Sequence, residues 1–187
     1  MKTQLFLYLL LCKGGMNMAE KELIIKAKNG DADAFCQLYG EYKDRLFRYA
    51  YYKLGNYEDA EDAVSSCVLS AFEQIKTLKR PEAFNAWIFR ILFCACSSQI
   101  KEQIERRSRS EAAENLLPDT ESGERHIERS ELKFALEKLT EEERDIVLLS
   151  VLGGLKSREI AKISSLTSGS VRSKLSRSLA KMREYLE

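Results

Sequence analysis

The chain has 187 residues, enough for one domain of ordinary size or two small ones, and its 44% hydrophobic content is ample for packed cores. The 30 Lys and Arg residues nearly balance the 29 Asp and Glu residues, which leaves a formal net charge of +1. This balance excludes a uniformly basic protein, so any nucleic-acid binding must come from charges clustered on particular faces. Few prolines and long runs of Ala, Leu, Glu, Lys and Arg predict an all-α protein.

Residues 1–17 are a doubtful leader. The apolar run at residues 5–11 imitates the start of a secretory signal, but it is too short to span a bilayer. We therefore expect no export and no stable membrane insertion. Residues 13–15 can be encoded by a ribosome-binding sequence just upstream of Met16 and Met18. This gives the hypothesis that translation starts at one of those methionines instead of Met1.

Residues 18–107 are expected to form a first helical domain. Its helices are marked by caps at Asp31 and Asn56 and by an interruption at Pro81. Between these breaks, apolar residues recur at steps of three and four, the spacing of one inward helical face. The three inward sets are Phe35, Leu38, Tyr39, Tyr42, Leu46 and Tyr49; Val64, Cys67, Val68, Ala71, Phe72 and Ile75; and Phe84, Trp87, Ile88, Ile91, Leu92 and Ala95.

Residues 108–129 lose this periodicity, are rich in Glu, Arg and Ser, and are predicted to be a polar linker. Residues 130–187 are expected to form a second domain. Apolar spacing returns there from Leu132 to Leu139, and Thr140 with Glu143 has the form of a capping box. The predicted fold is thus two small helical domains joined by a polar linker.

The second domain ends in the pattern of a helix-turn-helix. Residues 157–163 and 168–186 are predicted helices around a short polar turn, and Thr167 can cap the second one. That helix turns Val171, Leu175, Leu179, Met182 and Leu186 inward. Its other face, supported by Arg158 from the preceding helix, presents hydroxyls and cations suited to base edges and phosphates: Ser170, Arg172, Ser173, Lys174, Ser176 and Arg177.

Charge supports DNA binding by this segment. Residues 156–187 hold eight Lys or Arg against three Asp or Glu. A basic helix face on its own is more often merely solvated. Here the turn, the cap and the apolar stripe favour a DNA-reading helix.

Residues 139–186 resemble region 4 of extracytoplasmic-function sigma factors. The motifs that carry the resemblance are Leu-Thr-Glu-Glu-Glu-Arg from 139, Arg-Glu-Ile-Ala from 158, and Gly-Ser-Val-Arg-Ser-Lys-Leu-Ser-Arg from 169. Residues 33–39, 58–62 and 84–91 resemble successive segments of region 2 of the same family. The resemblance covers nearly everything after Met18, and its specificity lies in finding both regions in order.

The resemblance implies roles for two groups of region 2 residues. The acidic helix would dock on core RNA polymerase through Glu58, Asp59, Glu61, Asp62, Ser65 and Ser66. The downstream promoter element would be captured by Lys76, Lys79, Arg80, Phe84, Asn85, Trp87 and Arg90. For Trp87 its place in an apolar stripe favours a core position, and the loop at residues 75–82 is the better candidate for base capture.

Two departures from the family bear on these roles. Ser65 and Ser66, followed by Val68, stand where the family usually has Gln-Glu and an aromatic residue, which bears on polymerase affinity. Phe93 and Cys94 intervene where the family usually ends the segment after Trp87 with Arg-Asn, which bears on promoter melting.

The sequence as a whole favours a cytoplasmic sigma factor whose partners are core RNA polymerase, promoter DNA and an anti-sigma factor. The alternative is a stand-alone helix-turn-helix regulator that does not act as a polymerase subunit. An enzyme is disfavoured because there is one histidine, no phosphate-binding glycine loop and no nucleophile elbow. The five cysteines lack the spacing of a metal site and are expected to be free thiols. We therefore expect no metal, no cofactor and no small-molecule substrate.

Overall fold

A computed structural model describes residues 17–110 and 127–186 of the chain. Within these ranges every regular element is helical, which confirms the predicted all-α class. The elements are α2 (Met18–Lys28), α3 (Ala32–Leu54), α4 (Tyr57–Gln74), the short 3-10 turns η1 (Ile75–Thr77) and η2 (Pro81–Ala83), α5 (Phe84–Ser110), α6 (Ile127–Glu137), α7 (Glu141–Val151), α8 (Ser157–Ile163) and α9 (Ser168–Leu186).

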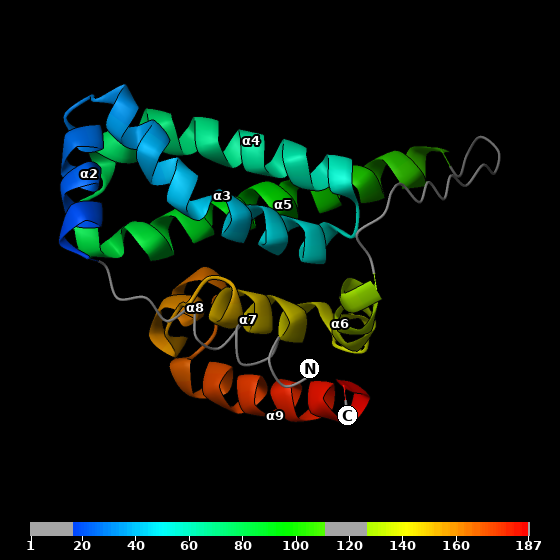
Figure 1. Cartoon of the computed structure of the whole chain (residues 1–187). Helices are drawn as coiled ribbons and strands as arrows, with labels where there is room; N and C mark the ends of the chain where they lie inside the picture. Colours follow the sequence, from blue (N-terminus) through cyan, green and yellow to red (C-terminus); the bar gives the residue numbers. More distant parts are fainter. Residues whose placement is uncertain (1–16, 111–126, 187) are drawn as a thin grey trace.

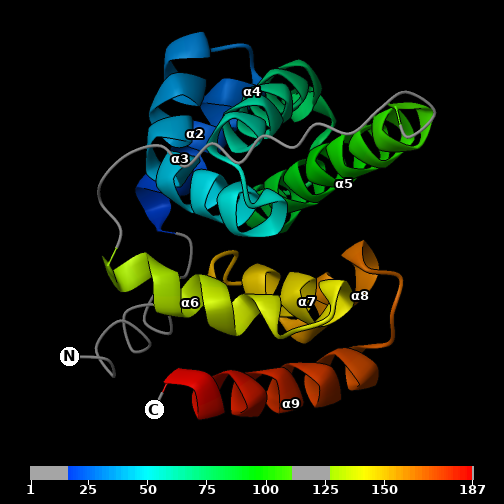
Figure 2. The ribbon, with the colours of Figure 1, turned by 90° about the vertical axis from the view of Figure 1, so that its right-hand side faces the viewer.

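The helices form two units that lie one above the other. Helices α2 to α5 make the upper unit and α6 to α9 the lower unit, with α7 lying between α3 and α9 (Figures 1 and 2). Helix α9 therefore forms the outer edge of the lower unit. This arrangement leaves one side of α9 open to a partner.

The helix starts follow the predicted chemistry. The side chains of Asp31 and Asn56 accept hydrogen bonds from the backbone N–H groups of Ala34 (2.9 Å) and Asp59 (3.2 Å). Each bond satisfies a donor that a helix N-terminus leaves unpaired. Gly55 between α3 and α4 has a φ of 77°, a left-handed conformation that glycine adopts without steric cost.

Helix α2 was not among the helices that periodicity predicted. Its start carries the same kind of cap, because the Asn17 side chain accepts a hydrogen bond from the N–H of Glu20 at 2.7 Å. Only Ile24 and Ala27 of this helix are buried. Two buried residues three positions apart are too short a pattern to stand out in a sequence.

The inward faces differ from the predicted ones at three residues of α4 and α5. Phe89 and Cys96 are fully buried in α5, although neither belonged to the predicted stripe. Phe72, predicted to face inward, is 49% exposed and contacts Phe35 only edge-on, with ring centroids 5.1 Å apart. The inward face of α5 is wider than the predicted stripe, because this helix packs against both α3 and α4.

The described helices extend into the predicted linker at both ends. Helix α5 continues to Ser110 and α6 begins at Ile127, so residues 108–110 and 127–129 are helical. An exposed ion pair between Glu102 and Arg106, one turn apart and 3.2 Å long, supports the last turns of α5. The remainder of the predicted linker and residues 1–16 of the predicted leader lie outside the described residues.

Helix α5 lies in a long apolar segment of the kind that can cross a membrane. The segment Pro81–Arg106, which runs from η2 through most of α5, is long and apolar enough to cross a membrane by length and composition alone. Core helices of globular proteins pass the same test, and α5 packs against α3 and α4. The observation is therefore weak support for membrane insertion.

The lower unit contains the predicted helix-turn-helix. At its entrance Thr140 and Glu143 form the predicted capping box, each side chain accepting the other residue's backbone N–H. Between α8 and α9, Ser165 has a φ of 56°, which turns the chain sharply. Thr167 then caps α9 by accepting the N–H of Ser170 at 3.1 Å, as predicted.

Candidate nucleic-acid interface

The outer face of α9 carries polar side chains free of the core. Arg172, Ser173, Ser176 and Arg177 are all exposed, whereas Val171 and Met182 are buried on the opposite side. Positions three and four apart lie on one helix face, so the four exposed residues form one continuous surface. The structure thus brings most of the predicted reading residues together.

Three other predicted reading residues hold flanking positions. Ser170 is part of the helix cap, where its hydroxyl lies 2.8 Å from that of Thr167. Lys174 is half-buried and pairs with Glu142 of α7 at 3.2 Å. Arg158 is exposed at the start of α8. Hydroxyls and guanidinium groups are suited to contacts with base edges and phosphates.

The buried side of α9 differs from prediction at Ser178. This residue is fully buried, and its hydroxyl has no hydrogen-bond partner among the described residues. Leu175 and Leu179 are only partly buried. The inward stripe therefore centres on Val171, Ser178 and Met182, rotated slightly from the predicted one.

The connection between α4 and α5 presents a second cluster of cations. Lys76, Lys79 and Arg80 are exposed on the two 3-10 turns and the residues between them. Glu82 is anchored to α2 by a 2.9 Å ion pair with Lys21, which ties this connection to the rest of the upper unit. The predicted base-capturing loop is therefore an ordered, basic segment without α-helix.

Three of the predicted downstream residues are buried or half-buried, unlike the exposed cations of the connection. Phe84 is 1% exposed and packs edge-on against Tyr42, so its ring is not accessible to a DNA base. The prediction that Phe84 captures the downstream element is incompatible with this position, because Phe84 fills the core where η2 meets α5. Trp87 is half-buried beside Phe84, as its apolar stripe suggested, and Asn85 bonds to a backbone carbonyl of the lower unit. Arg90 is exposed on α5.

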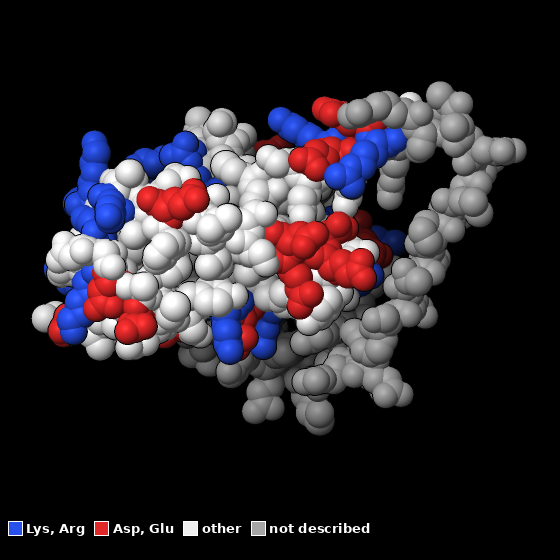
Figure 3. All heavy atoms as spheres, turned by 90° about the horizontal axis from the view of Figure 1, so that it is seen from above, with Lys and Arg blue, Asp and Glu red and all other residues white. Residues whose placement is uncertain are grey.

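The exposed face of α4 combines acidic and apolar side chains. Figure 3 shows acidic side chains gathered over the half of the upper face where α4 begins. Asp59 is the least free of the predicted contacts, because Gln103 of α5 donates a 2.8 Å hydrogen bond to its carboxylate. The other predicted polymerase contacts are all exposed: Glu58, Glu61, Asp62, Ser65 and Ser66.

Leu69 and Phe72 extend this acidic face along α4 and were missed as surface residues by the sequence reasoning. Their exposed fractions are 61% and 49%. Ser65, Leu69 and Phe72 follow one another at steps of four and three, so their spacing contained the signal. We call Glu58, Glu61, Asp62, Ser65, Leu69 and Phe72 the α4 stripe.

The described cysteines offer no metal site. No group of three or more His, Cys, Asp or Glu residues converges among the described residues, and Cys36, Cys67, Cys94 and Cys96 are free thiols. Burial raises the pKa of the Cys67 and Cys96 thiols to about 12. Such thiols remain protonated near neutral pH and are poor nucleophiles.

Comparison with known proteins identifies the family of this chain. A family model for Sigma-70 region 2 matches residues 38–108, and one for Sigma-70, region 4 matches residues 129–182. The ECF RNA polymerase sigma factor BldN of Streptomyces coelicolor is 31% identical over 160 residues, covering 81% of this chain and 60% of BldN. The ECF RNA polymerase sigma factor SigW of Bacillus subtilis is 26% identical over 184 residues, covering 91% and 98%.

The chain belongs to the extracytoplasmic-function family of sigma factors. Both sigma regions are present in order, which favours this assignment over a stand-alone helix-turn-helix regulator. The sigma factor RpoE of Bartonella quintana, solved with the anti-sigma factor NepR, superposes with a TM-score of 0.69 at 21% identity, covering 81% of this chain and 96% of RpoE. CnrH, solved with the cytosolic domain of CnrY, gives 0.65 at 23% identity, with coverages of 90% and 97%. At such identities these likenesses show the fold of this sigma factor.

Proposed function

We propose that this sigma factor binds core RNA polymerase and directs transcription initiation at specific promoters. The observation that carries the proposal is the outer face of α9, where Arg172, Ser173, Ser176 and Arg177 stand exposed at the end of a helix-turn-helix. An α-helix of this kind fits the major groove of duplex DNA, where each base pair presents a distinct pattern of donors and acceptors. This face would read the upstream promoter element.

The upper unit would supply the other two contacts. The α4 stripe would dock on core polymerase, its two large apolar side chains burying surface and its carboxylates setting the orientation. Lys76, Lys79, Arg80 and Arg90 would hold the backbone of the downstream element. Residues 18–107 and 130–187 are the proposed extents of these two functional regions.

The polymerase performs the chemistry, so this chain needs no catalytic group, and it would act in the cytoplasm beside the polymerase. We also propose an anti-sigma factor as a regulatory partner. The exposed apolar side chains of the α4 stripe, Leu69 and Phe72, support a protein partner of this kind.

The proposal is tested by assembling the purified chain with core RNA polymerase and selecting bound duplexes from a promoter library. We expect the chain to co-elute with core and the assembly to protect a shared sequence. Replacing Leu69 and Phe72 with serine should weaken co-elution, whereas replacing Ile25 and Ile104, which are also exposed apolar residues, should not. A chain that neither co-elutes nor selects any sequence would contradict the proposal.

A further inference from the structure

Helix α2 packs across both ends of the connection between α4 and α5. Figure 1 shows α2 lying across the end of the upper unit where α4 ends and α5 begins, and α2 contacts both η1 and η2. Ile24 of α2 is fully buried, and Ile75 and Leu78 of the connection are 2% and 4% exposed. We call residues 75–83 the basic connection, because they hold three exposed cations: Lys76, Lys79 and Arg80. The basic connection is therefore built on α2 as well as on the two helices that it joins.

An ion pair ties α2 to the far end of the basic connection. The Lys21 amine lies 2.9 Å from the Glu82 carboxylate, and the two side chains are 43% and 57% exposed. The hydrogen bond from Lys21 is the largest cause that lowers the pKa of Glu82, and the Arg80 charge acts in the same direction. An exposed pair of this kind contributes little to the stability of the whole chain. Its effect is local, because it fixes where the Glu82 carboxylate lies.

Glu82 is the only carboxylate in the sequence of the basic connection. The three cations of the connection form no ion pair with another described residue. Because the Arg80 charge acts on Glu82, a Glu82 side chain released by Lys21 would be free to pair with Arg80. Arg80 would then be less able to bind a DNA phosphate. Lys21 therefore keeps the one acid of the connection away from its cations.

The residue before Lys21 holds the start of α5. The Tyr42 hydroxyl of α3 donates a 2.6 Å hydrogen bond to the Glu20 carboxylate of α2. The Tyr42 ring packs edge-on against Phe84, the first residue of α5, with ring centroids 5.2 Å apart. Adjacent residues of α2 thus hold the end of the basic connection and the helix that follows it. A binding segment held in one shape in advance loses less conformational entropy when it binds.

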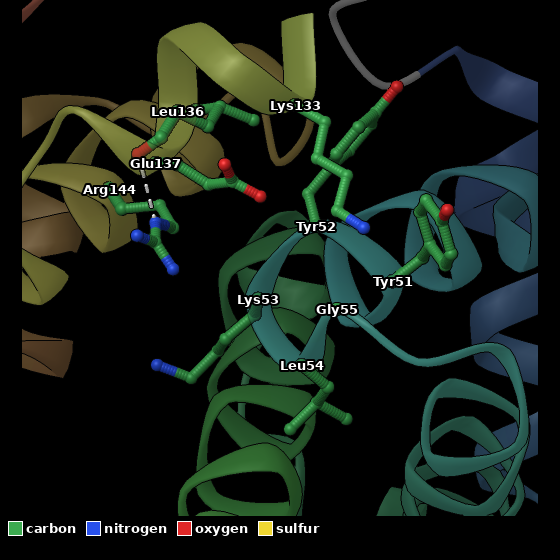
Figure 4. Close-up of a pocket in the computed structure, with 9 residues that line it drawn as sticks. All are labelled: Tyr51, Tyr52, Lys53, Leu54, Gly55, Lys133, Leu136, Glu137 and Arg144. Carbon is green, nitrogen blue, oxygen red and sulfur yellow. Dashed lines mark hydrogen bonds between the residues drawn. The ribbon is translucent and has the colours of Figure 1, made fainter. Parts of the chain in front are cut away.

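The cations of the crevice between the two units have different surroundings. Figure 4 shows Lys133 and Arg144 beside the Glu137 side chain, and Arg144 donates a 3.1 Å hydrogen bond to the Leu136 carbonyl. An anion in this crevice would meet a carboxylate. In the basic connection the one carboxylate is paired with a residue outside it, so the connection is the better phosphate-binding surface of the two.

We propose that Lys21 and Glu82 are positioning residues that set the selectivity of this sigma factor for the downstream promoter element. Their ion pair holds the basic connection in the shape in which Lys76, Lys79 and Arg80 stay free for DNA phosphates. In this role neither Lys21 nor Glu82 contacts DNA, because each binds the other. The inference rests on the proposed function for the DNA that is bound, but the contact itself is measured on the free protein.

The contact is tested by hydrogen–deuterium exchange of the backbone amides of residues 75–83 in the free full-length chain. Lys21→Glu and Glu82→Lys each replace attraction by repulsion, so each should raise the exchange rate there about two- to fivefold. The double variant restores an ion pair with the charges exchanged, and Lys21→Arg preserves the original one. Both should therefore exchange at the wild-type rate.

Lys26→Glu is the matched control. Lys26 is an exposed lysine of α2, and its 3.0 Å ion pair with Glu22 stays within that helix. Breaking this pair should leave the exchange rate of residues 75–83 unchanged. Exchange in α9 should be the same in every variant, which shows that the lower unit stays folded.

Base discrimination supplies the second readout, with core RNA polymerase present. The probe is the duplex selected from the promoter library, compared with duplexes that carry one changed base in the downstream or the upstream element. Lys21→Glu and Glu82→Lys should each lower discrimination at the downstream element about two- to fivefold and leave that at the upstream element unchanged. The ratio between bases is measured because overall affinity would also follow the altered net charge. The double variant should regain wild-type discrimination.

The two readouts separate the contact from its role. Single variants that exchange at the wild-type rate in residues 75–83 would overturn the contact. Faster exchange with wild-type discrimination would overturn its role in promoter selectivity. Equal loss of discrimination at both elements would also overturn that role, because a contact in the upper unit should affect the downstream element alone. If the assembly with polymerase selected no sequence, the proposed function would fail, while the exchange result would still decide the contact.

Discussion

The amine of Lys53 and the carboxylate of Asp145 form a buried ion pair that joins sigma region 2 to sigma region 4. The pair lies 92 residues apart in the chain. Neither residue belongs to the predicted DNA or polymerase surfaces. The contact therefore joins the two regions to each other, whereas the exposed faces of α4 and α9 are the proposed binding surfaces.

The positive charge of Lys174 gives a prediction about salt. If Lys174 contacts a phosphate, Lys174→Gln should reduce the slope of log binding constant against log salt concentration by about one unit. Lys101→Gln, which neutralises an exposed lysine of α5, should leave the slope unchanged. The measurement is a titration of the upstream duplex at several salt concentrations. An equal effect of both variants would argue against a specific contact by Lys174.

A side chain at Gly153 should destabilise the folded chain. A Cβ atom there would lie 2.4 Å from the Leu149 carbonyl oxygen, so the end of α7 must shift. Gly153→Ala should lower the free energy of unfolding by about 1–3 kcal/mol. Gly40 in α3 has open space around it, and Gly40→Ala should raise stability by about 0.5–1 kcal/mol. Urea unfolding of both variants measures the contrast, and a harmless Gly153→Ala would refute the close approach.

Replacing Ser165 with glycine should stabilise the folded chain. Its φ of 56° lies in the left-handed region, which costs a residue with a side chain about 1 kcal/mol. Ser165→Gly should therefore raise the melting temperature of the chain. Ser98→Gly, at an exposed site inside α5, should lower it, because glycine weakens helix interiors. Calorimetry distinguishes the two, and a loss of stability at Ser165 would contradict the strain.

The buried thiols predict a loss of stability at alkaline pH. Burial raises the pKa of Cys67 and Cys96 from 9.0 to about 12, so the unfolded chain releases these protons before the folded chain does. Their contribution is fully present below pH 9 and is lost as pH rises from 9 to 12, by at most about 1.4 kcal/mol per pH unit for each thiol. Cys67→Ala should make the decline shallower, as measured by urea unfolding across this range. Cys36→Ala, at an exposed thiol, is the control.

Local chemistry was predictable from the sequence, and long-range packing was not. The caps at Asp31, Asn56, Thr140 and Thr167 depend on residues three positions apart, so spacing alone indicates them. The exposed face of α9 followed from helical periodicity for the same reason. Motif spacing also indicates both sigma regions, which the family models match at residues 38–108 and 129–182.

The contacts of Phe84, Asn85 and Lys53 depend on how separate helices meet. Phe84 belonged both to an inward apolar set and to a motif implied to capture DNA, and its edge-on contact with Tyr42 of α3 places it in the core. Lys53 has no partner within its own helix pattern, since the Asp145 carboxylate that it binds is on another unit. No local pattern encodes a meeting of this kind, because it depends on the packing of α3 against α7.

Run-off transcription measures whether this chain directs initiation at a promoter. Core RNA polymerase with this chain, on a template that carries the selected promoter, should give a transcript of defined length that core alone does not give. Arg172→Gln combined with Arg177→Gln should reduce that transcript at least about tenfold without reducing co-elution with core, because each base contact contributes about 1–3 kcal/mol. Absence of any promoter-dependent transcript with the wild-type chain would contradict its assignment as an initiation subunit.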